Sequence, residues 1–189
     1  QQTAEADAAV RRARDAAPQA ARPLILAGQR ALRAGAHAEA LSLWGVLVVT
    51  HPAAFNLVAR DYANAAIAAG EPAAALEQLL ELYRRAPTMD MLSAMGLLDG
   101  DAAQQQERVR AHLRNHPTLA AAQAFLALPA TDAQAAAACA PVRDAVTRAA
   151  QPLHRYRCAA CAFEAQHYFW QCPGCLSWDS YPPQRLEDL

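Results

Sequence analysis

The sequence predicts an all-α protein, a solenoid of paired helices that ends in a small metal-binding knuckle. Three observations support this prediction. Glycine, alanine and proline recur at fixed positions along much of the chain, and the segments between them carry apolar residues at helical spacing. Two Cys-x-x-Cys pairs then follow near the C-terminus, within residues 158–175.

The recurring positions lie 35 residues apart and define a helical repeat. Each repeat would be a hairpin, because glycine ends the first helix, alanine allows the second helix to approach closely, and proline ends that helix. A period near 34 residues with this pattern is typical of tetratricopeptide repeats. The matching positions are Gly35, Ala40, Trp44 and Pro52, then Gly70, Ala75, Leu79 and Pro87, with Gly100 and Pro117 keeping the glycine-to-proline distance of 17 residues.

The first residues fit the second half of a repeat. Pro18 lies 34 residues before Pro52, so we expect residues 1–18 to form the second helix of a repeat whose first helix, with further repeats, lies upstream. The alternative is a natural capping helix, which the charged residues of this segment would also suit.

Apolar spacing and helix-ending residues predict the other elements. On the helix over 72–85 we expect a buried stripe of Leu76, Leu79, Leu80 and Tyr83. Pro141 would either begin a helix or kink one. The expected helices are about 3–16, 20–34, 37–50, 54–69, 72–85, 88–98, 102–115 and 118–127, with one or two more between 131 and 150. We divide the chain into repeats over 1–127, a helical connector over 128–155 and a metal-binding module over 156–189.

The four cysteines of that module predict a tetrathiolate metal site. Two residues between cysteines let the backbone turn so that both thiolates face one ion, and a second such turn completes a tetrahedron. Two disulfides or free thiols are the alternatives; a thioredoxin-like redox motif would have one such pair rather than two. Four sulfurs suit zinc or a mononuclear iron, and this choice stays open. The ligands are Cys158, Cys161, Cys172 and Cys175.

Composition excludes several classes. The chain has 189 residues, 54% of them hydrophobic, and a formal net charge of -1, so it is neither a basic nucleic-acid binder nor an acidic tail. No apolar run approaches the roughly 20 residues that cross a bilayer. The fifth cysteine, Cys139, lies in an alanine-rich stretch where we expect a buried small hydrophobe. Thiols that serve as ligands, with no secretion signal, indicate a reducing compartment.

The histidines do not form a catalytic arrangement in the sequence. None accompanies an obvious nucleophile or forms an H-E-x-x-H motif. His51 and His116 precede prolines at matching repeat positions, where the C-terminal end of a helix favours a positive residue. His154 and His167 could replace a cysteine ligand, but four thiolates already suffice. We therefore predict a protein that is not an enzyme.

Residues 21–127 and the cysteine module together resemble the C-terminal part of the LapB (YciM) family, lipopolysaccharide assembly protein B. The most specific motifs are Tyr-Arg-Cys-Ala-Ala-Cys-Ala-Phe over 156–163, Phe-Trp-Gln-Cys-Pro-Gly-Cys over 169–175, and Trp178. Ala162 stands where the family has glycine, which would strain the knuckle slightly. The Asp-Ser-Tyr-Pro stretch over 179–182 also departs from the family pattern.

This resemblance implies an N-terminal membrane anchor, a cytoplasmic repeat array and a rubredoxin-type metal domain, with the four cysteines as ligands, by family convention of iron. It implies a regulatory adapter on the cytoplasmic face of the bacterial inner membrane. Such an adapter promotes degradation of the deacetylase LpxC by the protease FtsH and gathers lipopolysaccharide-assembly proteins. Whether the array forms a homo-oligomer is left open. The module's aromatic residues would either dock it onto the last repeats or form its own core: Phe163, Phe169, Trp170 and Trp178.

Other functions remain to be weighed. A rubredoxin-like electron carrier would use the same four sulfurs but needs iron and an accessible edge. The repeats alone would suit a generic protein interaction module. A zinc-ribbon nucleic-acid module should show a basic stripe, whereas the arginines near the knuckle are offset by carboxylates. Similar repeats accompany some glycosyltransferases and would suggest that activity, but this chain has no room for a nucleotide-sugar domain.

Overall fold

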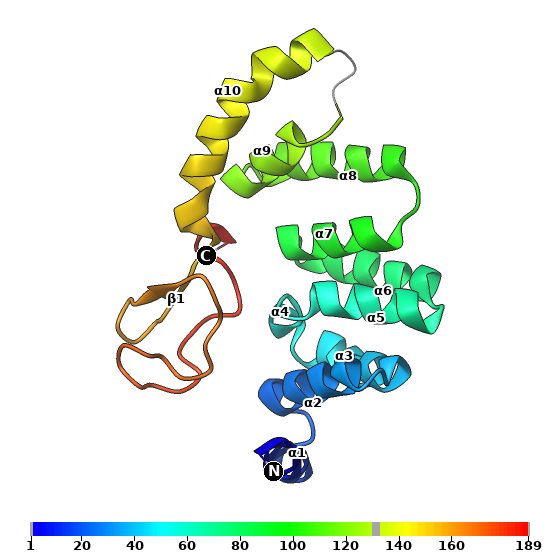
Figure 1. Cartoon of the computed structure of the whole chain (residues 1–189), viewed down its shortest axis with the longest axis vertical. Coiled ribbons are helices and arrows are strands. Elements are labelled where there is room, and N and C mark those ends of the chain that lie inside the picture. The colour runs from blue at the N-terminus through cyan, green and yellow to red at the C-terminus, as the bar shows by residue number, and fades with distance from the viewer. Residues whose placement is uncertain (1, 130–132, 189) are drawn as a thin grey trace. The chain divides into compact units, whose positions relative to one another are not determined.

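The computed structural model describes residues 2–129 and 133–188. The chain divides into two compact units, Gln1–Gly100 and Asp101–Leu189. Figure 1 follows the elements in chain order from blue to red. Helices dominate both units, and the sole described sheet is one two-stranded ribbon in the second, so the all-α prediction with a small C-terminal knuckle is confirmed.

The first unit is built from successive helices that pack on their neighbours, α2 on α3, α3 on α5, and α5 on α6 and α7. The predicted helices over 37–50 and 72–85 are found with those bounds. The helices are α1 (Gln2–Ala16), α2 (Ala21–Arg33), α3 (His37–Thr50), α4 (Pro52–Phe55), α5 (Ala59–Ala69), α6 (Pro72–Arg85) and α7 (Met89–Leu98).

One predicted helix, over 54–69, is instead two helices, α4 and α5. The amides of Asn56, Leu57 and Val58 each donate to the carbonyl three residues earlier. Such bonds tighten the backbone and end a helix. Pro52 also starts α4 earlier than expected, because proline is favoured in the first turn, where it lacks only an amide that would be unpaired.

The repeated positions form the core of the first unit. Ala40, Trp44 and Leu79 are fully buried, and Ala75 is nearly so. Gly35 and Gly70 take left-handed backbone angles, with φ of 76° and 78°; Gly35 is the second residue after α2, and Gly70 directly follows α5. Glycine ends both helices because it adopts this conformation without strain.

The buried stripe of α6 differs from the predicted one. Its buried residues are Ala75, Leu79 and Leu82, whereas Leu76, Leu80 and Tyr83 are only partly covered. Spacings of three and four residues place either set on one helical face. The face with the small Ala75 is the buried one because it permits the closest approach of a neighbouring helix.

The second unit begins with three helices, α8 packing on α9 and α9 on α10. A short 3-10 helix, η1, leads into a ribbon in which β1 and β2 pair antiparallel, with Tyr156 opposite Ala165. The elements are α8 (Ala102–Asn115), α9 (Leu119–Leu126), α10 (Ala133–Ala150), η1 (Gln151–His154), β1 (Tyr156–Arg157), β2 (Glu164–Ala165) and η2 (Leu186–Asp188).

Between 133 and 150 the structure has a single helix, α10, with Pro141 inside it. Residues 131 and 132 of the predicted segment lie outside the described residues. Cys139 is exposed, so its prediction as a core residue was wrong. The reason is that the neighbouring side chains of α10, including Val142, are also exposed, so this face is not covered by the unit.

Over the described residues, α1 to α10 include no helix with both the length and the apolar character needed to cross a membrane. His51 and His116 lie at the C-terminal ends of α3 and α8, as their place before proline predicted.

Candidate metal centre

Two backbone turns carry the four cysteines, and their hydrogen bonds are equivalent. In the first turn, the Cys158 amide donates to the Phe163 carbonyl at 3.0 Å and the Ala162 amide donates to the Cys158 carbonyl at 2.9 Å. The second turn, which starts at Cys172, repeats both bonds at 2.9 and 2.8 Å. The two Cys-x-x-Cys loops therefore present their sulfurs in the same way.

The four sulfur atoms converge on one point. All lie within 4.8 Å of one another, with Cys158 Sγ 3.8 Å from Cys175 Sγ and Cys161 Sγ 3.7 Å from Cys172 Sγ. A tetrahedral ion with metal–sulfur bonds of about 2.3 Å requires sulfur–sulfur distances of about 3.8 Å. A disulfide would require about 2.05 Å. The cluster has the size of a single tetrathiolate site and holds the cysteines as free thiols.

The surroundings of the sulfurs favour their charged form unequally. The Ser180 hydroxyl lies 3.2 Å from Cys158 Sγ, and its hydrogen bond, with help from backbone amides, lowers the pKa of Cys158 to about 6. Bonds from the Ser177 hydroxyl and amide lower the pKa of Cys175. The Phe163 amide favours the Cys161 thiolate, but burial and the neighbouring sulfurs raise the pKa of Cys161 to about 12.

These unequal pKa values of the clustered thiols fit a cation site. Four clustered thiols cannot all ionise without a positive charge among them, because each thiolate disfavours the next. A bound ion would supply that charge, and the displaced protons would leave with solvent.

A left-handed residue follows the second cysteine of each pair. Ala162 has φ of 62° and Leu176 has φ of 60°, although neither is glycine. The predicted strain at Ala162 is thus present, and the same strain at Leu176 was not predicted. Its signal was available, since Leu176 is the residue after Cys175 just as Ala162 is the residue after Cys161.

The segment after the second pair closes over the sulfurs. The Ala159 amide donates to the Ser180 carbonyl at 2.7 Å. Tyr181 is 3% exposed, and its hydroxyl donates to the Phe163 carbonyl at 3.3 Å and lies 3.8 Å from Cys172 Sγ. Burial raises the pKa of Tyr181, so this phenol stays neutral.

The aromatic core of the module differs from the expected one. Tyr156 and Tyr181 are buried, and Tyr168 makes edge-on ring contacts with both and with Trp170. The other three candidates, Phe163, Phe169 and Trp178, are 43%, 38% and 54% exposed. Of the predicted four, Trp170 contacts Tyr168, and the partly exposed Phe169 contacts Tyr181 with ring centroids 6.3 Å apart, so the core is built mainly from tyrosines.

The C-terminal tail links the module to the last helices of the same unit. The Leu186 amide donates to the Arg155 carbonyl at 2.9 Å, and Arg185 donates to the His154 carbonyl at 2.7 Å. Glu187, whose side chain is 5% exposed, accepts a hydrogen bond from the Ala120 amide in the first turn of α9 at 3.1 Å. A carboxylate is favourable at this end of a helix because the first amides carry partial positive charge.

The histidines lie apart from the sulfurs. His154 Nε2 is 3.8 Å from Glu187 Oε1. The rings of His112, on α8, and His116, the residue after α8, have centroids 5.1 Å apart. Among the described side chains, the four cysteines are the only group of three or more potential ligands that could hold an ion.

Helical hairpins followed by this tetrathiol module define a class of protein, the tetratricopeptide-type arrays that carry a rubredoxin-type metal domain. Residues 156–183 match the family described as "Rubredoxin metal binding domain". Lipopolysaccharide assembly protein B of Escherichia coli K12, and the same protein of Escherichia coli O157:H7, are each 31% identical to this chain over 90 residues. The aligned segment covers 46% of this chain and 23% of each relative. The chain is therefore similar to lipopolysaccharide assembly protein B over the aligned segment, and residues 156–183 match the rubredoxin-type domain family.

Proposed function

We propose that this chain is part of a non-enzymatic regulatory adapter that controls lipopolysaccharide supply. The observation that carries the proposal is the tetrathiol module, which has the geometry of one ion site and is tied through Glu187 to the last helices. Helical arrays of this type offer extended surfaces for protein partners. The family match and the similarity to lipopolysaccharide assembly protein B support the biological context.

In this proposal Cys158, Cys161, Cys172 and Cys175 hold one iron or zinc ion. The ion stabilises the module, which has few buried side chains of its own; bound metal contributes on the order of 10 kcal/mol in zinc-dependent peptides. The chain's own residues then do the rest. Ser180 and the knuckle amides hold the sulfurs, and the tail from Tyr181 to Glu187 connects them to α9.

The proposed partners are FtsH, LpxC and proteins of lipopolysaccharide assembly, at the cytoplasmic face of the inner membrane. The chain spans about a quarter of the length of the curated relatives it matches. The proposal of these partners is therefore based on the resemblance of the array and the module together to lipopolysaccharide assembly protein B.

The test is capture of LpxC and FtsH from a bacterial membrane extract by the immobilised chain, read with specific antibodies. The double variant Cys158→Ser, Cys172→Ser should lose the ion and at least tenfold of the capture. Cys139→Ser is the matched control, since this exposed cysteine lies outside the cluster, and it should keep both. Capture that persists after the ion is lost would show that the module and the docking surface are not coupled.

A second candidate function is electron transfer, favoured by the exposure of two of the four cysteines, Cys161 and Cys175. This function requires iron and a reversible one-electron couple. An absorption spectrum of the purified chain and its redox titration test this candidate, because a zinc-loaded chain would show neither a visible charge-transfer band nor a potential and would exclude electron transfer.

A further inference from the structure

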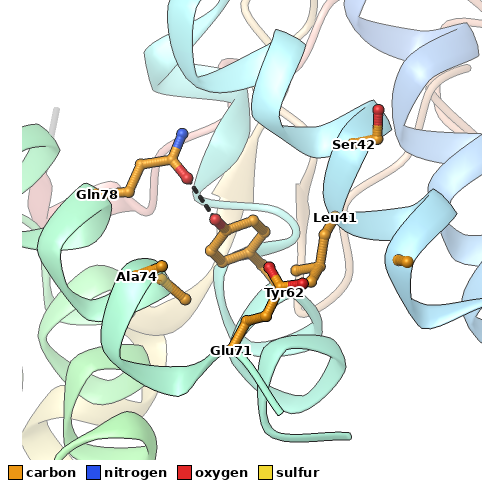
Figure 2. Close-up of a pocket in the computed structure, with 8 residues that line it drawn as sticks. Leu41, Ser42, Tyr62, Glu71, Ala74 and Gln78 are labelled. Carbon is orange, nitrogen blue, oxygen red and sulfur yellow. Dashed lines mark hydrogen bonds between the residues drawn. The ribbon is translucent and has the colours of Figure 1, made fainter. Parts of the chain in front are cut away.

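A pocket of about 320 Å³ lies in the first unit, remote in sequence from the sulfur cluster. It opens between α3 and α6, both of which pack on α5, and the ring of Tyr62 on α5 forms part of its lining. Figure 2 shows the Tyr62 hydroxyl pointing to Gln78, with Leu41 and Glu71 close to the same ring. The volume is at the lower end of ligand pockets, which suits a single side chain rather than a cofactor.

Tyr62 is held rigidly within this pocket. Its side chain is 5% exposed, and its ring meets Phe55 edge-on with centroids 5.2 Å apart. Its hydroxyl donates a hydrogen bond to Gln78 Oε1. Burial, and then the charge of Glu71, raise the pKa of Tyr62, so the phenol is neutral and its oxygen remains an acceptor.

Glu71 supplies a negative charge at the same pocket. It is the residue immediately before α6, yet its side chain makes no capping hydrogen bond to that helix. None of the eight described lining residues is basic, so this carboxylate is the pocket's only formal charge. Leu41 and Ala75 add apolar wall beside it.

We propose that this pocket binds an arginine or lysine side chain of a partner protein. The cationic head would meet the Glu71 carboxylate and the Tyr62 oxygen, while the alkyl stem would lie against Leu41 and Ala75. Charge complementarity selects this occupant, because a carboxylate beside a fixed neutral acceptor favours a cation that donates hydrogen bonds. The site goes beyond the adapter function proposed above and does not depend on the ion.

The test is an NMR titration of the full chain with N-acetyl-arginine methylamide. N-acetyl-citrulline methylamide serves as the neutral probe of the same shape. We expect the arginine probe to shift the signals of Tyr62, Glu71 and Gln78 and to bind at least tenfold more tightly than the citrulline probe, since charge-assisted hydrogen bonds are the stronger ones. Equal binding of the two probes, or no shift at these residues, would overturn the proposal.

Variants test the same claim without dependence on one substitution. Glu71→Gln should weaken the arginine probe about tenfold, and Tyr62→Phe should weaken it less. Glu77→Gln, on the same helix but outside the lining, should leave it unchanged. If Glu77→Gln matches Glu71→Gln, the effect is general charge and the site is refuted. A dimer that Glu71→Gln converts to a monomer in sedimentation would assign the pocket to a second copy and overturn the proposal of a different partner.

Discussion

Gly28 and Trp44 fit each other in the packing of α2 against α3. A Cβ atom added at Gly28 would lie 2.2 Å from Trp44 Nε1, and Trp44 is fully buried, so its ring has no room to move away. We predict that Gly28→Ala lowers the free energy of unfolding by about 1–3 kcal/mol, the usual range for overpacking.

A urea denaturation series measures this, with Gly45→Ala as the control. Gly45 is also inside a helix, but a Cβ there meets nothing within 4 Å. Removing that glycine should stabilise the protein by about 0.5–1 kcal/mol, because alanine is the better helix former. Equal effects at both positions would refute the specific contact.

Ala162 and Leu176, the left-handed residues that follow the second cysteine of each pair, give a second prediction. Ala162→Gly and Leu176→Gly should each stabilise the metal-loaded module by up to about 1 kcal/mol, since a side chain in this conformation costs about 1–2 kcal/mol. Leu176 is 66% exposed, so little apolar burial is lost with its side chain. The time to release the ion to a chelator is the measurement. Ala160→Gly, in the same knuckle but without a positive φ, should bring no gain.

His112 makes the free energy of unfolding depend on pH. Burial, and then the charge of His116, lower the pKa of His112 in the folded chain. The folded state therefore binds fewer protons than the unfolded state below about pH 6.5, the ordinary value for histidine. Its contribution to the free energy of unfolding falls as pH drops through the window between the lowered pKa and 6.5, and is constant above it.

We predict that His112→Gln reduces this loss of stability in acid. The measurement is the difference in free energy of unfolding between pH 7.5 and pH 5.5, compared with His167→Gln, an exposed histidine whose replacement should leave the difference as it is. The same slope in wild type and His112→Gln would contradict the assignment.

At the scale of elements, the C-terminal tail connects two parts of the second unit through Glu187 and Ala120. Glu187→Ala should lower the free energy of unfolding by about 1–2 kcal/mol and speed hydrogen exchange in the first turn of α9, because the partly buried Ala120 amide loses its acceptor. Asp144→Asn, an exposed carboxylate of α10, is the control and should change neither. Unchanged exchange in Glu187→Ala would show that the tail does not hold α9.

The helices could be predicted from sequence where local chemistry sets their ends. Gly35 and Gly70 end helices through their own backbone angles, and Thr88 and Thr118 begin them with side-chain oxygens that accept amides of α7 and α9. The division of 54–69 into α4 and α5 could not be predicted, because tight bonds at Asn56 to Val58 replace a regular turn without any glycine or proline there.

The cysteine cluster was predictable for a similar reason, since the spacing within each pair sets a local turn. The contacts that hold this cluster in place could not be predicted, because they join residues that lie far apart in the sequence. Tyr181 reaches Phe163 across 18 positions, and Glu187 reaches Ala120 across 67. The exposure of Cys139 was missed for the same reason, since an alanine-rich helix shows no apolar stripe from which its buried face could be read.

At the scale of the whole molecule, the ion and the first unit should be separable. The helices α1 to α7 are stabilised by apolar side chains such as Trp44, Phe55 and Leu92, which are fully or almost fully buried within that unit. We predict that a chelator removes the tertiary structure of residues 156–183 while most of the helical circular dichroism at 222 nm remains. Loss of most of that signal on chelation would contradict an independently folded first unit.

The most direct measurement of the central claim, that four thiolates share one ion, is the number of cysteines that iodoacetamide labels, read by intact mass without reductant. The chain has five cysteines, and only Cys139 lies outside the cluster. We predict one label on the metal-loaded chain and five after chelation in denaturant. A count that stays at one after chelation and rises to five only with reductant would mean two disulfides, and five labels from the start would mean no site at all.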